Sequence, residues 1–489
     1  MTTEQAGPAP DDRRWRALAV SLTAGFMTLL DTSIVNVALP SMERGLHADE
    51  AELSWVVSGY ALTFGLALVP AGRLGDVRGR REVFLLGLAL FTLTSAACGL
   101  APNGAWLVLF RLLQGAAGGM VAPQTSGLIQ QLFTGEERAR AFGMMASVIA
   151  TSTAVGPLTG GLLLHAAGAE DGWRWVFYVN VPIGVVAFAA ALRLFPRHPA
   201  TADRHDGLDL PGVLLLGASV LAVMLPFVQE QQWPGRRKWA LLPLAALLLA
   251  AFWAWERRQT RRGRAPLVDL GLFSLRSYSL GTLLSLVYFG GFTTLFFVYT
   301  LFLQNNMGYG ALAAGVASMP FALGSAAMAT ASGRLVVRHG RRLVVTGLCG
   351  VSVGLLGVVL IVQWVPGPAI GWAAALPLLV AGIGSGLIVS PNTTLSLSLV
   401  PVQRAGAASG VLQTAQRIGS AAGIAAVGSL YFAHLANHGS PRAALQLALL
   451  GSVGIILLAL LLACADLRER QIGPGLERKE EEATAQQGS

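Results

Sequence analysis

Fourteen apolar segments, each long enough to cross a lipid bilayer as a helix, account for most of this 489-residue chain. A spanning helix needs about 20 predominantly apolar residues. Hydrophobic residues make up 54% of the chain and charged residues only 12%, roughly half the charged fraction of a soluble domain. The segments therefore predict an all-α, polytopic membrane protein, although the short eighth segment leaves twelve spans as an alternative to fourteen. The predicted spans are 17–39, 53–71, 83–101, 105–131, 141–165, 174–195, 208–228, 239–255, 278–303, 313–333, 343–365, 373–397, 405–431 and 443–466.

The distribution of Lys and Arg predicts which side of the membrane each loop faces. Most of the 35 Lys and Arg residues fall in alternate loops, together with the N-terminal arm (1–16) and the charged tail (467–489), which we expect to be disordered. Cytoplasmic loops carry such an excess, so we expect both termini in the cytoplasm and an even number of spans in the cell membrane. This topology also accounts for the net charge of +9 without any nucleic-acid partner.

Cysteine, histidine and glycine patterns give no sign of a catalytic or metal centre. Cys98, Cys349 and Cys464 lie inside predicted spans without ligand-like spacing, and the seven His residues are scattered. The chain has no Gly-x-x-x-x-Gly-Lys-Ser/Thr phosphate loop. We therefore expect no metal, no cofactor and no catalytic residues, which disfavours an ATP-driven pump and leaves a polytopic membrane enzyme as a weaker alternative to a transporter.

A repeated loop divides the chain into two halves. The stretch GRLGDVRGRR (72–81) returns as GRLVVRHGRR (333–342), with six of ten positions identical. Parallel repeats build many transporters and place the binding site between the halves. The repeat predicts an N-terminal six-helix bundle (17–195), a linker with two extra spans (196–277) and a C-terminal six-helix bundle (278–466).

Three ionisable side chains lie deep within predicted spans, namely Asp31, Arg111 and Arg417. A charge at membrane depth costs about 3 kcal/mol or more, so such a residue usually serves a function. Asp31 is the only acidic residue clearly within a span, and a carboxyl group removed from water favours its protonated form. It could carry a proton or contact a substrate; alternatively it is structural and is held by Ser33, Asn36 or a free backbone amide.

Five stretches resemble motifs of the major facilitator superfamily. GRLGDVRGRR looks like the A motif, LVLFRLLQGAAGG (107–119) the B motif, and TSTAVGPLTGG (151–161) the C motif of antiporters. LDTSIVNVALP (30–40) and WRWVFYVNVPIG (173–184) are similar to motifs of the fourteen-span drug:proton antiporters. The resemblance covers nearly the whole chain. It implies a major facilitator fold of two six-helix bundles plus two inserted helices, and a proton-coupled exporter of hydrophobic or amphiphilic drugs or antibiotics.

Within this resemblance, Asp31 and Arg111 are the expected proton-coupling residues. Arg111 cannot lose its own proton, so it would act by moving towards Asp31 or away from it. The alternative is a fixed role, in which Arg111 binds helix carbonyls or Gln114.

The A and C motifs imply moving contacts. Asp76 is expected to cap the third span or to bind an arginine, and its counterpart in the second copy is Val337. Proline removes an amide donor from a helix, so the C motif is expected to break the fifth span and to seal one side of the transporter; ordinary close packing is the alternative. The predicted gating and latch residues are Gly72, Asp76, Arg78, Arg80, Arg81, Gly156 and Pro157.

The substrate is expected to bind between the halves, and its charge stays open. Arg417 could contact an anionic group or pack against polar groups of its own half. A dedicated exporter of an endogenous metabolite, antibiotic or lipid is the alternative to a drug exporter. The scarcity of lysine beside arginine indicates a bacterial source, and we expect a monomer. The predicted cavity residues are Asn36, Tyr60, Gln114, Phe292, Asn392, Gln413 and Arg417.

Overall fold

The computed structural model describes residues 11–168, 171–196, 209–229, 233 and 235–487. The first ten residues of the N-terminal arm, nearly all of the polar loop 196–207 and the end of the tail lie outside this part. Within it, fourteen helices are long and apolar enough to cross a membrane, which confirms the predicted number of spans and the all-α class.

The N-terminal half contains α1 (Asp11–Leu46), α2 (Glu50–Arg78), α3 (Arg80–Gly99), α4 (Gly104–Leu132) and α5 (Gly135–Ala167), with a sixth span made of α6 (Gly172–Tyr178) and α7 (Asn180–Leu194). The inserted spans are α8 (Leu210–Val228) and α9 (Leu241–Arg261), which follows the short 3-10 helix η1 (Arg236–Ala240). After η2 (Leu270–Ser274), the C-terminal half contains α10 (Arg276–Met307), α11 (Ala311–His339), α12 (Arg341–Trp364), α14 (Ala375–Leu397), α15 (Ala405–Ala436) and α16 (Pro441–Gln487). The short helices η3 (Gly367–Ala369) and α13 (Ile370–Ala373) precede α14, and η4 (Val402–Arg404) precedes α15.

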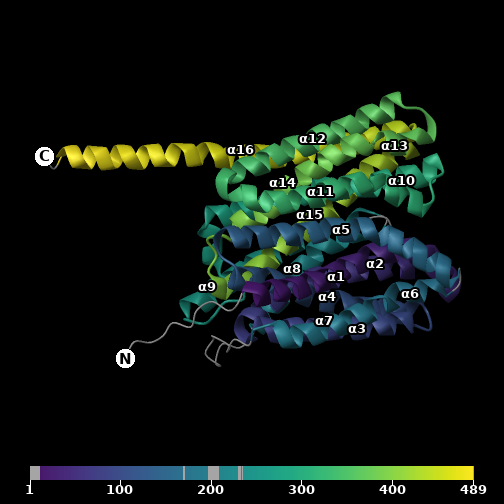
Figure 1. The fold of residues 1–489 in the computed structure, drawn as a ribbon, viewed down its shortest axis with the longest axis horizontal. Helices are drawn as coiled ribbons and strands as arrows, with labels where there is room; N and C mark the ends of the chain where they lie inside the picture. The colour runs from purple at the N-terminus through teal and green to yellow at the C-terminus, as the bar shows by residue number, and fades with distance from the viewer. Residues whose placement is uncertain (1–10, 169–170, 197–208, 230–232, 234, 488–489) are drawn as a thin grey trace.

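The two halves lie side by side as two helix bundles (Figure 1). They meet along two seams, where α5 packs against α11 and α2 against α15. Small residues allow this approach, because the main chains of Gly72 and Gly406 nearly touch across one seam and small residues let membrane helices pack closely. Helix α8 covers the second seam, since its Met224 packs with Leu62 of α2 and Ile418 of α15.

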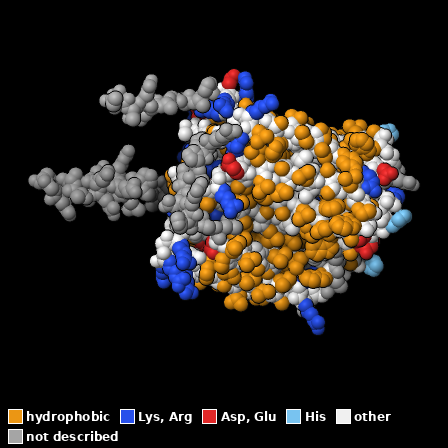
Figure 2. Space-filling view, turned by 90° about the horizontal axis from the view of Figure 1, so that it is seen from below, with side chains coloured by type: hydrophobic (Ala, Val, Ile, Leu, Met, Phe, Trp, Pro, Cys, Tyr) orange, Lys and Arg blue, Asp and Glu red, His pale blue; other side chains and the backbone are white. Residues whose placement is uncertain are grey.

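The outer surface carries the hydrophobic band that a bilayer requires. Figure 2 shows apolar side chains over the middle of the molecule and charged side chains gathered towards its two ends. Large apolar residues on this surface are strongly exposed, such as Leu214 (71%) and Val186 (69%). Exposed apolar area of this extent marks a lipid-facing surface rather than a water-facing one.

Two predicted boundaries differ from the structure. The eighth span is longer than 239–255, because α9 runs on to Arg261. Helix α16 continues through the charged tail to Gln487 and projects beyond the bundle (Figure 1), since Glu, Lys, Ala and Gln are strong helix formers. An isolated helix is marginal in water, so disorder of the tail stays a prediction.

Candidate functional site

The Asp31 carboxylate lies at the centre of a fully buried polar cluster in the N-terminal half. Arg111 of α4 donates from Nη1 to Oδ2 at 2.5 Å, and Gln114, one turn further along the same helix, donates to Oδ1 at 3.0 Å. Asn180, the first residue of α7, donates to Oδ1 at 2.9 Å. Three donors from two other helices therefore surround one carboxylate.

Arg111 is held from every side. Its Nε donates to the carbonyl oxygen of Val56 at 3.0 Å, and Nη1 also contacts Gln114 Oε1 at 2.8 Å. The Tyr60 ring lies beneath the guanidinium at 4.1 Å, while the Tyr60 hydroxyl donates to the carbonyl oxygen of Thr28. The structure thus brings Asp31 and Arg111 together. It also corrects the assignment of Tyr60 and Gln114, because both belong to this cluster and do not line the cavity.

The suggested structural holders of Asp31 are also wrong. Ser33 donates to the carbonyl oxygen of Thr153, and Asn36 donates to that of Thr32. The side chain that holds Asp31 from another segment is Asn180, an amide within the motif at 173–184. Asn180 also bonds Ser95 of α3, so five helices, α1, α2, α3, α4 and α7, meet at this cluster.

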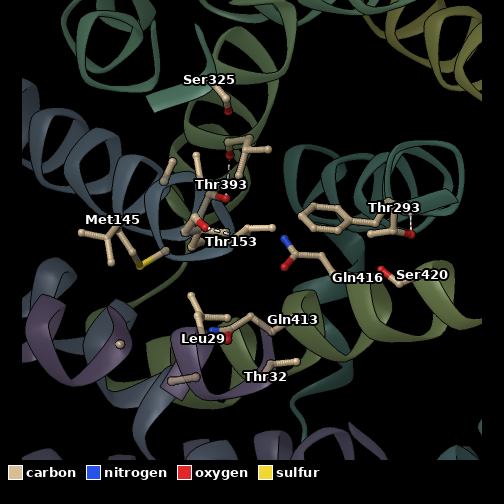
Figure 3. A pocket seen from close by; sticks show the side chains of 18 of the residues that line it. Leu29, Thr32, Met145, Thr153, Thr293, Ser325, Thr393, Gln413, Gln416 and Ser420 are labelled. Atoms are coloured by element: carbon tan, nitrogen blue, oxygen red, sulfur yellow. Dashed lines mark hydrogen bonds between the residues drawn. The ribbon is translucent and has the colours of Figure 1, made fainter. Parts of the chain in front are cut away.

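A cavity of about 360 Å³ separates the two halves. Helices of both halves line it, and Figure 3 shows Gln413 and Gln416 of α15 facing Thr32 of α1 and Thr153 of α5. Four of the predicted residues line this cavity: Asn36, Phe292, Gln413 and Arg417. Asn392 does not. Its side chain binds Arg341 and the carbonyl oxygen of Gly281 within the C-terminal half, so its assignment to the cavity is corrected.

The wall of the cavity on the C-terminal side is aromatic. Phe292 packs against Phe289, Phe296 and Phe321 with ring centroids 5.5–5.6 Å apart. The facing surface of α1 is mixed: hydroxyl and amide groups of Thr28, Thr32, Ser33 and Asn36 line the cavity beside Leu22, Gly25 and Leu29. An apolar wall with a few polar groups is typical of small-molecule sites.

Pro157 does not break α5, which is continuous from Gly135 to Ala167. A proline frees the carbonyl four residues earlier, here that of Thr153, and the Ser33 hydroxyl donates to it at 3.1 Å. The partner from α1 compensates the missing bond, which corrects the expected break. A methyl group on Gly156 would lie 2.4 Å from the Ser33 hydroxyl, so the glycine permits the contact.

Asp76 joins the two halves at the end of α2. Its carboxylate accepts from the backbone amides of Gly406 (3.0 Å) and Ala407 (2.9 Å), in the first turn of α15. Arg80 binds the same carboxylate at 2.9 Å and contacts the carbonyl oxygen of Val402 in the other half. The expected cap therefore exists on a different helix, because the N-terminus of α15 supplies free amides beside the loop.

Two of the predicted latch residues lie outside this contact. Arg78 is exposed, and Arg81 donates to the carbonyl oxygen of Leu192 at the end of α7. Gly72 belongs to the contact because a Cβ there would lie 2.2 Å from the Gly406 carbonyl oxygen.

The second copy of the loop is organised differently. Arg341, the counterpart of Arg80, is buried and pairs with Asp466 of α16 at 3.1 Å, and it donates to the Ser277 carbonyl oxygen at 2.9 Å. Asp466 and Glu256 are 2% and 0% exposed. Asp31 is thus not the only buried acidic residue on a spanning helix, since Asp466 is the last residue of the predicted span 443–466 and Glu256 lies just past the predicted span 239–255 on α9.

Two bundles around a central cavity, with a buried ion pair beside it, define a multi-pass membrane transporter. The Major Facilitator Superfamily model matches residues 21–424. The chain is 34% identical over 460 residues to the "Probable actinorhodin transporter" of Streptomyces coelicolor, covering 91% of this chain and 78% of that protein. It is 35% identical over 474 residues to "Puromycin resistance protein pur8" of Streptomyces alboniger, covering 93% and 91%.

The proton:xylose symporter XylE, bound to 6-bromo-6-deoxy-D-glucose, has the same fold, with a TM-score of 0.65 at 14% identity over 92% of this chain and 95% of that one. This chain belongs to the major facilitator superfamily. The resemblance drawn from its motifs is confirmed, and the enzyme alternative is set aside because the family consists of transporters.

Proposed function

We propose that this protein exports hydrophobic or amphiphilic antibiotics or drugs in exchange for protons, by alternating access. The relatives named for transport of actinorhodin and for resistance to puromycin support the direction and the class of substrate. The observation that carries proton coupling is the buried contact of Asp31 with Arg111.

Proton binding at Asp31 would act on the contacts between helices. The ionised carboxylate accepts hydrogen bonds from side chains of α4 and α7. A protonated carboxyl group has no charge and one acceptor site fewer, so the attraction to Arg111 is lost. Arg111 keeps the Val56 carbonyl oxygen as a partner and stays with the N-terminal half.

Helix α1 would carry this change to the substrate. Asp31 does not line the cavity, whereas Leu29 and Ser33, two positions to either side of it and therefore on the opposite face of α1, do. A turn or shift of α1 after protonation therefore alters the cavity without any contact between substrate and Asp31. We propose that Asp31 carries the proton only.

The two ends of the transporter would open in turn. With both termini in the cytoplasm, the Asp76 contact closes the cytoplasmic side. Opening to that side requires the two hydrogen bonds from the backbone amides of Gly406 and Ala407 to Asp76 to break. The contact of Gly156 and Pro157 with α1 and α11 would control the opposite side, since Pro157 packs against Gly315 of α11.

Substrate-induced proton movement in everted vesicles tests the proposal. Actinorhodin added to vesicles with an acidic interior is expected to release protons, detected by recovery of a quenched pH-sensitive dye. Asp31→Asn should abolish this release while the protein remains in the membrane. Glu43→Gln is the matched control, because Glu43 lies on the same helix and is exposed.

Wild-type proton release by Asp31→Asn would refute the role of Asp31. Proton release with actinorhodin and with a panel of unrelated drugs supports a multidrug exporter. Release with a single compound class supports the dedicated exporter.

A further inference from the structure

Arg417 is the only residue with a charged side chain among those that line the cavity in the described part of the chain. Among the described residues, no aspartate or glutamate lines it. A cavity between transporter halves that holds one cation and no anion has a defined electrostatic preference. It attracts an anionic group and repels a cationic one.

The guanidinium of Arg417 has no carboxylate partner among the described residues. It lies over the Phe64 ring at 4.5 Å, a contact that leaves its hydrogen-bond donors available. Asp31, the acidic residue within the apolar part of α1, already accepts from Arg111, Gln114 and Asn180. The positive charge of Arg417 is therefore not neutralised by the cluster next to the cavity.

Other donors surround Arg417 on the same face of α15. Ser409, Gln413, Gln416 and Ser420 follow the helical spacing and all line the cavity. The Gln416 amide points into the cavity in Figure 3, and the Gln413 amide donates to Ser409. This polar stripe lies in the same cavity as the phenylalanine wall of α10 and α11.

We infer that the substrate is an aromatic anion, with its ring system against the phenylalanine wall and its oxyanion on Arg417. A guanidinium binds a carboxylate, sulfonate or phenolate through parallel N–H groups, and such charge-assisted bonds are the strongest available in a cavity removed from water. The same cavity penalises a cationic drug, which would meet Arg417 without any carboxylate to balance it. This inference rests on the proposed export function and narrows its substrate class.

Three matched compounds test the charge preference on the purified full-length protein in detergent. Anthracene-9-carboxylate, its neutral carboxamide and the (anthracen-9-ylmethyl)trimethylammonium cation share one ring system. Their Kd values are measured by thermal shift and fluorescence titration, without a pH gradient. The carboxylate is expected to bind at least about tenfold more tightly than the cation, with the amide between them.

Variants of Arg417 identify the group responsible. Arg417→Gln should weaken carboxylate binding at least about tenfold and change amide binding little, which removes the preference. Arg417→Lys should retain the preference in part, since it keeps the charge but loses the planar fork. Gln413→Ala, on the same helix and in the same cavity, is the control and should change all three Kd values by similar factors.

Tighter binding of the cation or the amide, binding of none of the three, or an unchanged preference in Arg417→Gln would each overturn the inference. Should Arg417→Gln fail to fold, the wild-type ranking and Arg417→Lys still decide. Because binding is measured without a gradient, a carboxylate preference together with no substrate-induced proton release would refute the proposed proton coupling alone.

Discussion

The two copies of the repeated loop make different contacts with the same helical framework. In the first copy, Asp76 and Arg80 reach across the molecule to the start of α15. In the second copy, Val337 replaces the acidic residue and is 59% exposed, while Arg341 binds Ser277 and Asp466 of its own half. The loop sequence is therefore similar in the two halves, but its arginine contacts the other half in the first copy and its own half in the second.

This difference separates a movable contact from a fixed one. The Asp76 contact can open when the halves part, because its amide partners belong to the other half. The Arg341 contact stays within one half and joins α12 to α10, α14 and α16. Breaking a buried ion pair by removing one partner costs about 3–5 kcal/mol, so a contact of that kind suits a permanent structural joint.

The largest expected effect follows removal of the acidic residue of the first copy. Asp76→Ala deletes two charge-assisted bonds to amides, which are worth about 2 kcal/mol or more in the closed state, or roughly a 30-fold change in its population. Substrate-driven proton release should fall at least about tenfold, and binding of anthracene-9-carboxylate to the purified protein should persist. Arg80 keeps the carbonyl oxygens of Gly127 and Val402 as partners, so the protein should still fold.

Val337→Ala is the matched control at the equivalent position and should leave transport near the wild-type rate. Equal losses in the two variants would show that the loops are equivalent and would remove the basis of the comparison. Asp76→Asn, which keeps one acceptor oxygen, should lie between wild type and Asp76→Ala.

A smaller effect, shared by both copies, is expected where the glycines pack. A methyl group on Gly72 would lie 2.2 Å from the Gly406 carbonyl oxygen, and one on Gly333 would lie 2.5 Å from that of Ala139. Overpacking typically costs about 1–3 kcal/mol. Gly72→Ala and Gly333→Ala should therefore both reduce proton release by a few-fold, in contrast to the unequal acidic position. Gly454→Ala, at a glycine with open space around it, should be silent, and a loss confined to Gly72→Ala would mean that only one seam closes.

The sequence predicted the spans and the halves because apolar length and the Lys/Arg distribution are direct requirements of the bilayer. It also identified Asp31 and Arg111, since a charge at membrane depth is rare and expensive. Rotation of each helix about its axis was not predictable. Helices inside a bundle are apolar on most faces, so the local sequence pattern does not predict the direction in which each polar side chain points. It does not indicate that Tyr60 and Gln114 face Arg111 while Gln413 faces the cavity.

The polar partners that the sequence did not reveal come from distant segments. Asn180 approaches Asp31 across 149 positions, and Asp466, the last residue of the predicted span 443–466, approaches Arg341 across 125 positions. Such pairs depend on how the helices within each half pack against one another. The partner of Asp76 was not predictable for a related reason. The free amides of α15 are backbone groups, and every residue type except proline has one, so the sequence does not mark them.

The smallest expected effect comes from restoring the missing acidic residue in the second copy. Val337→Asp places a carboxylate four residues before Arg341, as Asp76 stands before Arg80. Arg341 already has Asp466 and Asn392 as partners, and an added exposed ion pair contributes about 0–1 kcal/mol. The Tm in detergent should stay close to that of wild type, and the rate of substrate-driven proton release should stay within about twofold of it.

Asp466→Asn removes the existing carboxylate, so in that background Val337→Asp should recover part of the lost thermal stability, measured as Tm in detergent. Recovery would mean that the position of the acidic group, and not the loop itself, decides whether this arginine joins one half or bridges two. The absence of any recovery would mean that a carboxylate at the exposed loop position cannot pair with the buried arginine. The two copies would then differ in backbone placement as well as in sequence.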